Sequence, residues 1–225
     1  MRLTHVVLAA ALLVSASTAF PQSSTVANGP VIDILGMSME EAAGQRRVID
    51  DVNAALKGRF HLLQGIEANI GADGDLDLSA EEVTTFDIVL AAPHSRLRRS
   101  EDQTDRMLRA IETPHVRILA HPRGRISGSR AGVIADWDRV FAAAARRSVA
   151  IEIDGDPARQ DLDHTMAERA LAAGCLFALD SDAHTTTQLS YADTALAHAR
   201  LAAIPADRII NCWPLERLLA WIAQP

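Results

Sequence analysis

The stretch from Leu176 to His184 combines a predicted strand with side chains that bind metal ions. Four apolar residues, 176–179, run directly into a polar segment that contains Asp182 and His184. An apolar run of this length predicts a buried strand that presents polar groups at its carboxyl end. Asp182 and His184 are two residues apart, so in extended backbone they point to the same side. Both can then bind one metal ion or two neighbouring ions.

The same arrangement recurs in four apolar runs upstream. Each run is mostly apolar and ends at or near a carboxylate or a histidine. The runs are 62–67, ending at Glu67; 86–94, ending at His94; 116–121, ending at His121; and 149–153, followed by Asp154 and Asp156. We interpret Glu67, His94 and His121 as metal ligands together with Asp182 and His184. For Asp154 and Asp156 a ligand, a support for a ligand and a turn residue remain open.

Histidine and carboxylate ligands without cysteine suit Zn, Mn or Fe better than a structural thiolate site. Such ions lower the pKa of a bound water to about 7 and stabilise both the attacking and the leaving oxygen of a phosphate ester. The sequence has neither a phosphate-binding P-loop nor the Gly-x-Ser-x-Gly motif of serine hydrolases. Metal-assisted hydrolysis is therefore the chemistry that these residues favour.

Two further residues are candidates for binding the substrate. Arg125 follows His121 by four positions and could hold a phosphate with its forked guanidinium, although a solvated loop arginine is the equal alternative. Ser95 directly follows His94. By contrast, His61 and His115 precede their strands and are expected at the opposite, structural end of the sheet.

Predicted strands and helices alternate along the chain, which indicates an α/β fold with parallel strands. We expect about six strands, the last at 208–210. Polar residues at the carboxyl ends of the strands are typical of a (β/α) barrel, whose sites form on that face. Helices are predicted at 38–56, near 79–84, from a capping box at Ser100 and Gln103 to 112, at 136–147, up to 173, at 192–201 and after Pro214.

The composition suits one globular domain with a sizeable core. The chain has 225 residues, of which 48% are hydrophobic and 23% charged. A formal net charge of -7 provides no strong nucleic-acid footprint, although a phosphate ester remains a possible substrate. Cys175 and Cys212 make no disulfide framework and are interpreted as reduced thiols.

The first thirty residues differ from the rest. Arg2 precedes an apolar run, 6–14, and small residues follow, which is the order of a secretory signal peptide cleaved after Ala19. The run is too short for a stable membrane span. We therefore divide the chain into 1–30, a signal-peptide-like or degenerate segment with a linker, and 31–225, the hydrolase domain.

Four short motifs resemble those of the polymerase-and-histidinol-phosphatase (PHP) superfamily. They are Leu-Gln-Gly-Ile-Glu at 63–67, Ala-Ala-Pro-His-Ser at 91–95, His-Pro-Arg-Gly-Arg at 121–125 and Ser-Asp-Ala-His at 181–184. They come in the family's order and cover roughly residues 37–225. The most similar variety is found at the end of bacterial family X DNA polymerases and as stand-alone proteins.

The resemblance implies a distorted seven-stranded (β/α)7-type, TIM-like barrel that holds up to three metal ions and hydrolyses phosphoesters. By this resemblance Glu67, His94 and His121 surround one ion, while Asp182 and His184 complete two others. The number of Zn, Mn or Fe ions is accordingly one to three. The implied substrate is a phosphorylated small molecule or a nucleic-acid end.

The chain departs from the family pattern at its beginning. The His-x-His of the first motif and the Thr-Asp-His-Ser of the second are absent. Residues 1–19 then replace two barrel strands, or they are a signal peptide; the resemblance favours a cytoplasmic protein, with export as the alternative. A barrel without its first two regular strands has an open edge, through which the protein could associate with itself.

Three functions are compatible with these observations to different degrees. The first is a metal-dependent phosphoesterase that acts on a phosphate ester with a metal-activated water. The second is a catalytically degenerate PHP module that binds metal or a partner without turnover. The third, an amidohydrolase-type enzyme that cleaves C–N bonds, is disfavoured by the Gly-Ile-Glu and Ser-Asp-Ala-His signatures.

Overall fold

The computed structural model describes residues 38–56 and 60–224. The predictions made for 1–30, including the signal peptide, and the boundary between 30 and 31 lie outside these residues. In the described parts of the chain, no helix has both the length and the apolar character that crossing a bilayer requires.

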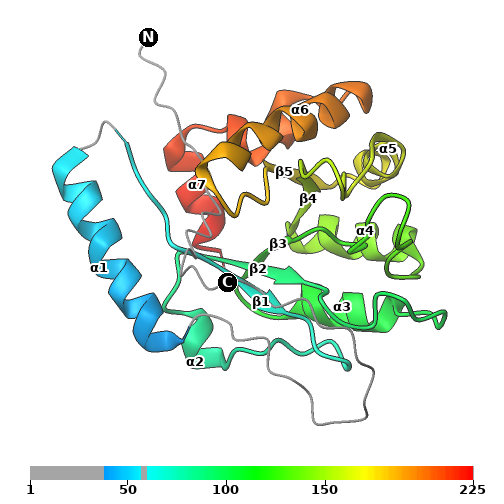
Figure 1. The fold of residues 1–225 in the computed structure, drawn as a ribbon, viewed down its shortest axis with the longest axis horizontal. Helices are drawn as coiled ribbons and strands as arrows, with labels where there is room; N and C mark the ends of the chain where they lie inside the picture. The colour runs from blue at the N-terminus through cyan, green and yellow to red at the C-terminus, as the bar shows by residue number, and fades with distance from the viewer. Residues whose placement is uncertain (1–37, 57–59, 225) are drawn as a thin grey trace.

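A parallel sheet of five strands organises the fold (Figure 1). The strands lie side by side in the order in which they occur in the sequence: β1 (Gly65–Asn69), β2 (Ile88–Ala92), β3 (Val116–Leu119), β4 (Ala150–Asp154) and β5 (Leu176–Asp180). Each strand pairs in parallel with the next. Sequential parallel order with intervening helices is the arrangement of consecutive (β/α) units in a barrel, so the predicted α/β class is confirmed.

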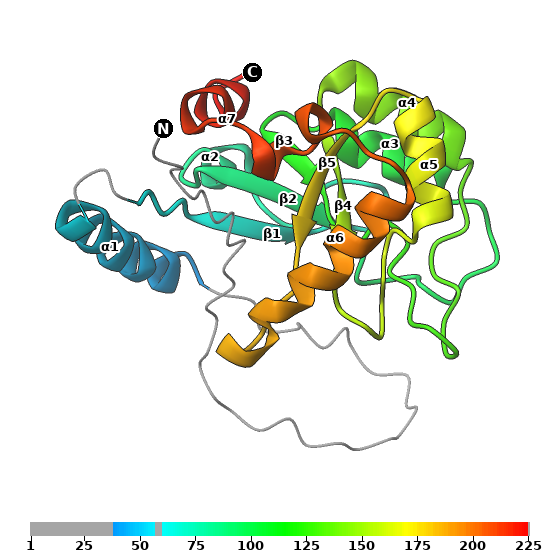
Figure 2. The same cartoon turned by 90° about the horizontal axis from the view of Figure 1, so that it is seen from above.

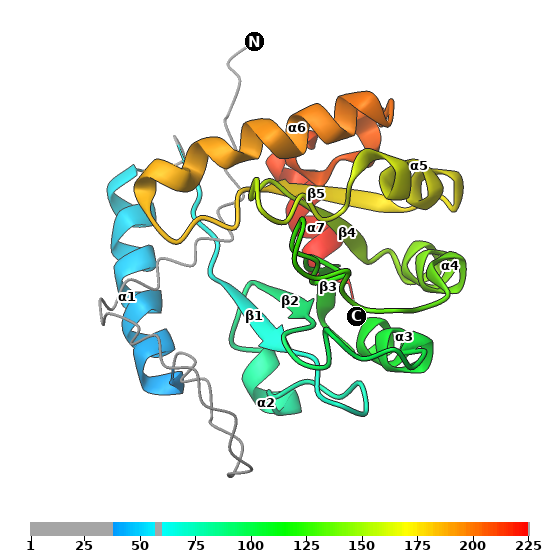
Figure 3. The same cartoon turned by 45° about the vertical axis from the view of Figure 1, so that its right-hand side comes forward.

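The helices cover the two faces of the sheet unequally. Figure 3 shows α3, α4, α5 and α6 along one side of the strands. The helix α7 packs against the other face. In Figure 2 α1 stands beside the β1 end of the sheet. The bounds of these elements are α1 (Met39–Leu56), α2 (Ala80–Val83), α3 (Thr104–Glu112), α4 (Trp137–Arg147), α5 (His164–Ala172), α6 (Ala192–Leu201) and α7 (Leu215–Ile222), with short 3-10 turns at Thr186–Tyr191, Ala206–Arg208 and Ile210–Cys212.

Two hydrophobic clusters fix the sheet between these layers. The larger cluster packs α3 to α6 against one face, with the fully buried Phe141 and Phe177 at its centre. The smaller cluster joins the other face to α7 through Leu218 and Trp221. Every residue of β2, β3 and β4 is buried, whereas most of β1 is only partly buried. The central strands therefore form a rigid support whose carboxyl ends can position side chains.

Local sequence explains where several helices begin. Ser79 and Glu82 form a reciprocal capping box at the start of α2. The side chains of Asp136 and Asp163 accept backbone N–H groups at the starts of α4 and α5. The capping box predicted at Ser100 is wrong, because α3 begins only at Thr104.

Two predicted strands also differ from the structure. The run at 208–210 is not a strand, because two 3-10 turns surround Ile209 and leave one isolated bridge between Ile209 and Phe177. The first described strand begins at Gly65 and continues to Asn69, beyond the predicted end at Glu67. Glu67 is therefore the middle residue of β1, and the strand positions Asn69 as well.

Candidate metal centre

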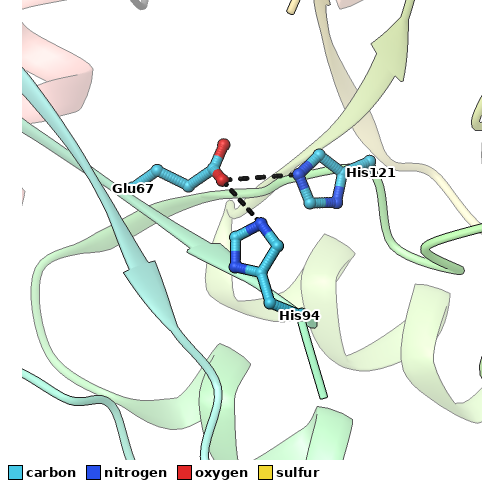
Figure 4. Close-up of side chains that lie close together, drawn as sticks. All are labelled: Glu67, His94 and His121. Carbon is cyan, nitrogen blue, oxygen red and sulfur yellow. Dashed lines mark ion pairs between the residues drawn. The ribbon is translucent and has the colours of Figure 1, made fainter. Parts of the chain in front are cut away.

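Glu67, His94 and His121 converge from three neighbouring strands (Figure 4). Glu67 lies within β1, His94 follows β2 by two residues, and His121 follows β3 by two residues. Oε1 of Glu67 lies 3.0 Å from Nε2 of His94 and 3.4 Å from Nε2 of His121. One ligand atom from each residue lies within 4.8 Å of the others. These distances allow one cation to contact all three side chains.

Asn69 orients the ring of His94. Nδ1 of His94 lies 2.5 Å from Oδ1 of Asn69. The Asn69 amide is itself oriented, because its Nδ2 donates to Oδ2 of Asp77 at 2.5 Å and its backbone N–H donates to Oδ1 of Asp77 at 2.7 Å. Nδ1 of His94 therefore carries a proton and donates to Asn69. This arrangement directs Nε2 of His94 toward Glu67, as a metal-binding nitrogen requires.

His121 is held in an unusual position. Its side chain is only 1% exposed, and its backbone adopts a positive φ of 22°. The backbone N–H of His121 donates to Oε2 of Glu152 on the neighbouring strand β4. Neither ring nitrogen of His121 has a hydrogen-bond partner among the described residues. A buried imidazole with two unsatisfied nitrogens fits a metal ligand, because a bound ion would satisfy Nε2.

The charges of this group depend on one another. Burial alone would raise the pKa of Glu67, but the charge and close approach of His121, together with the contact from His94, outweigh it and hold the pKa well below its usual value. Burial likewise acts to lower the pKa of His121, yet the carboxylate of Glu67 raises it to about 9. Without a metal ion, the buried pair is therefore an ionised carboxylate beside an imidazolium.

Asp182 and His184 lie outside this three-residue group. Asp182 has a positive φ of 44°, and its side chain is 16% exposed. Its Oδ2 lies 3.2 Å from Nε of Arg159. The side chain of His184 is 59% exposed, and its Nδ1 lies 2.8 Å from the backbone carbonyl oxygen of Asp182. Asp182 nevertheless lines the same pocket as Glu67.

Further carboxylates that sequence analysis did not select surround this pocket. Glu152 and Asp180 line it beside Glu67 and Asp182. Burial, reinforced by the charge of Asp180, raises the pKa of Glu152 well above its usual value. Burial also raises the pKa of Asp154 to about 8 and that of Asp180 to about 6, and the charge of Asp182 adds to both shifts. The pocket is thus an environment in which added positive charge is stabilised.

Arg159 is the functional candidate that the sequence did not reveal. It follows β4 in the loop that also carries Asp156, and its Nε lies 3.2 Å from Asp182 and 3.7 Å from Asp154. The negative charges of Asp182, Asp154 and Glu67 raise the pKa of Arg159, although burial acts against this. A loop arginine carries no distinctive sequence signal. Only the fold shows that this one lies beside the centre.

The two residues expected to bind substrate contact protein groups. Arg125 donates from Nη1 to Oδ2 of Asp163 at 2.7 Å and from Nε to the carbonyl oxygen of Arg159 at 2.8 Å. The carbonyl oxygen and the hydroxyl of Ser95 accept hydrogen bonds from the guanidinium of Arg106, each at 3.0 Å. Arg125 therefore supports Arg159, and Ser95 connects the loop of His94 to α3.

Comparison with known proteins finds relatives of both expected kinds. The chain is 31% identical over 190 residues to "DNA polymerase/3'-5' exonuclease PolX" of Bacillus subtilis (strain 168), covering 84% of this chain and 33% of the polymerase. It is 33% identical over 187 residues to "Probable phosphatase" of Shewanella piezotolerans, covering 79% of this chain and 70% of that protein. No protein-family model matches the chain.

Among solved structures, the histidinol phosphate phosphatase of Lactococcus lactis, crystallised with zinc, L-histidinol and phosphate, matches with a TM-score of 0.49 and 15% identity. That match covers 73% of this chain and 75% of the other. The first sequence relative is a DNA polymerase, and the second, the probable phosphatase, is matched over more than two thirds of its length. The four motifs and this extended similarity lead to one conclusion. The chain belongs to the PHP superfamily.

Proposed function

We propose that this chain is a metal-dependent phosphoesterase whose principal ion is held by Glu67, His94 and His121. The convergence of these three side chains from three strands is the observation that carries the proposal. Two imidazole nitrogens and one carboxylate oxygen form a donor set typical of hydrolytic zinc sites, and suit Mn or Fe as well. Asp182 and His184 are proposed as ligands of further ions in the same pocket, for a total of one to three.

When bound, the divalent ion would supply Lewis acidity and a water of lowered pKa. The protein's own residues have separate tasks. Glu67 remains ionised at neutral pH because its pKa is held low, so its charge is available to a cation. Asn69 keeps Nε2 of His94 directed toward the centre. The ionised Glu67 and the oriented His94 are thus ready to bind the ion before it arrives.

Arg159 is proposed to bind the phosphoryl group. Its Nε faces Asp182 and Asp154, and its terminal amino groups make no hydrogen bond to a described residue. A guanidinium with free Nη groups can donate two parallel hydrogen bonds to phosphoryl oxygens. Because Arg159 contacts Asp182, which lines the same pocket as Glu67, the phosphoryl group would lie between the arginine and the metal centre.

The class of substrate is proposed from the relatives. One relative is described as a probable phosphatase and the other as a polymerase with 3'-5' exonuclease activity. Since the chain spans only a third of the polymerase, that protein's full activity does not transfer to it. A phosphate ester is common to both descriptions. We therefore propose a phosphorylated small molecule or a nucleic-acid end as the substrate.

One observation favours a second candidate, a PHP module that binds metal or a partner without turnover. Asp182 pairs more closely with Arg159, at 3.2 Å, than with His184, at 3.9 Å, and the His184 side chain is largely exposed. If this arrangement persists when metal is present, only the ion at Glu67, His94 and His121 is bound. A single ion lacks the second cation that stabilises both oxygens of a displacement at phosphorus.

Hydrolysis of p-nitrophenyl phosphate with and without added Mn²⁺ tests the proposal. The phosphoesterase predicts metal-stimulated release of p-nitrophenol, which Glu67→Gln abolishes while circular dichroism shows that the variant still folds. His164→Gln is the matched control, because His164 stacks on His198 outside the three-residue group and should leave turnover unchanged. Metal binding without turnover would instead establish the binding module.

A further inference from the structure

The loop that follows His121 forms a short basic hairpin. Ile126 and Arg130 pair as an antiparallel bridge through two backbone hydrogen bonds of 2.9 Å. The tip, residues 127–129, is exposed, and the hairpin borders a surface cleft lined by Arg123, Arg125 and Arg130. The backbone N–H of Ser127 donates to the carbonyl oxygen of Ala158 at 2.7 Å, which attaches the hairpin to the loop of Arg159.

The arginines near this hairpin differ in how their charge is compensated. Arg123 and Arg125 both pair with the carboxylate of Asp163. Arg130 donates from Nε to the carbonyl oxygen of Gly124 at 2.6 Å. Arg98, from the loop that follows His94, donates from Nη1 to the carbonyl oxygen of Ser129 at 3.1 Å. Neither Arg98 nor Arg130 forms an ion pair with a carboxylate in the described parts of the chain.

Arg98 and Arg130 bring like charges to the same hairpin, since Arg98 contacts Ser129, the residue directly before Arg130. Burial lowers the pKa of Arg130, and the positive charges of Arg159 and Arg98 lower it further, while the carboxylate of Asp161 offsets only part of this. Unpaired cations that repel each other are destabilising unless an anion binds between them. This local excess of positive charge occurs in a chain whose formal net charge is -7.

The location of the pair connects it to the metal centre. Arg98 follows His94 by four residues, and Arg130 follows His121 by nine. Arg159 connects the two regions. Its side chain contacts Asp182, while its carbonyl oxygen accepts from Arg125 and that of the preceding Ala158 accepts from Ser127 of the hairpin. A ligand whose phosphoryl group contacts Arg159 could therefore extend toward Arg98 and Arg130.

We propose that Arg98 and Arg130 form a second anion subsite, which binds a further phosphate group of the substrate beyond the one that is hydrolysed. This inference rests on the proposed function, since it assigns the substrate of that same site. Two sources share the required chemistry. One is the second phosphate of a small bisphosphate, and the other is the next phosphodiester of a nucleic-acid end.

Three thymidine ligands separate these sources: the 5'-monophosphate, the 3',5'-bisphosphate and a 5'-phosphorylated dinucleotide. Release of inorganic phosphate or of mononucleotide gives kcat/KM where the full chain turns over with Mn²⁺. If no ligand is turned over, the proposed function fails, and isothermal titration of the same ligands still measures the subsite alone. The subsite predicts tighter binding or higher kcat/KM for one of the two larger ligands than for the monophosphate.

Arg98→Gln and Arg130→Gln should each remove about tenfold of this preference and leave the monophosphate unchanged, since a charge-assisted hydrogen bond is lost. Arg98 is exposed and makes one weak contact, so its variant should fold even if Arg130→Gln does not. Arg99→Gln removes the same charge from the same loop and serves as the control. Equal losses for all three ligands, no loss in either variant, or an equal loss in Arg99→Gln would overturn the proposal.

Discussion

Nδ1 of His94 lies 2.5 Å from Oδ1 of Asn69, four residues after the start of β1. This contact leaves Nε2 of His94 directed toward Glu67, at 3.0 Å. Asn69 can hold this orientation because Asp77 accepts from both its amide and its backbone N–H. Asp77, in a loop, therefore fixes the side chain of Asn69, and Asn69 in turn fixes the ring of His94, a candidate metal ligand.

Asn69→Ala should weaken metal binding by about 10- to 100-fold, because the ring of His94 loses the acceptor that fixes its tautomer. The dissociation constant for Mn²⁺ or Zn²⁺, measured by competition with a chelating dye, checks this. Asn53→Ala is the matched control, since Asn53 also makes two hydrogen bonds, both to the backbone of Leu62 and away from the centre. Equal affinities in the two variants would show that Asn69 has no role in metal binding.

Arg106→Met should destabilise the protein by about 3 kcal/mol or more, because several acceptors lose the donor that satisfies them. Arg106 is only 5% exposed, and its guanidinium donates to Ile70 and Gly71 in the loop after β1 and to Ser95 in the loop after β2. Urea unfolding measures the change. Arg109→Met, on the same helix, removes only an exposed pair with Asp75 and should cost at most about 1 kcal/mol. Similar losses in both variants would contradict this account.

The metal-free protein should lose stability as the pH rises from 6 to 9. The pKa of His121 is about 9 in the folded protein and 6.5 in the unfolded chain. Its stabilisation is therefore fully present below pH 6.5 and is lost as the pH passes through about 9. Asp154 acts in the same direction, because its folded pKa of about 8 lies above 3.8 and its ionisation becomes unfavourable as the pH rises.

Thermal unfolding of the chelator-treated protein at several pH values tests this dependence. At 1.36 kcal/mol per pKa unit, the His121 contribution is at most roughly 3 kcal/mol. His121→Gln should flatten the decline between pH 6.5 and 9, and added metal should raise the melting temperature most at alkaline pH. A melting temperature that increases over this range would show that the imidazolium is not stabilised in the folded protein.

Arg159→Gln should lower kcat/KM for p-nitrophenyl phosphate by about 100-fold, the usual effect of removing a donor to a developing negative charge. Because Arg159 contacts no member of the three-residue group directly, the metal content of the variant should remain that of the wild type. Arg159→Lys keeps the charge but not the fork and should recover only part of the activity. Loss of metal together with activity would assign Arg159 to structural support.

The sequence predicted the alternation of strands and helices because each apolar run is bounded by capping residues, glycine or proline. It failed at 208–210, where Ile209 is buried but no neighbouring strand extends the pairing beyond Phe177. It also failed at Ser100, because Asp102 instead accepts the backbone N–H of Thr104. At 208–210 the long-range pairing that a strand needs stops at one bridge, and at the start of α3 a neighbouring side chain takes the place of Ser100.

The candidate site is predictable where a metal-binding residue closes an apolar run. Glu67, His94 and His121 each do so in the sequence, and the structure brings their side chains together, although Glu67 lies in the middle of β1. Arg159 and Asn69 were not selected, since a loop arginine and a strand asparagine carry no chemical signature alone. Their proximity to the centre depends on the relative placement of neighbouring strands, which only the folded chain defines.

The metal content of the purified protein tests the central claim most directly. Elemental analysis should find at least one equivalent of Zn, Mn or Fe per chain in the wild type. Glu67→Ala and His121→Ala should each lose the ion at this centre, while circular dichroism shows an intact fold. His115→Ala, which alters a histidine outside the three-residue group, should retain it. Unchanged metal content in both the Glu67 and the His121 variants would contradict the assignment of this centre.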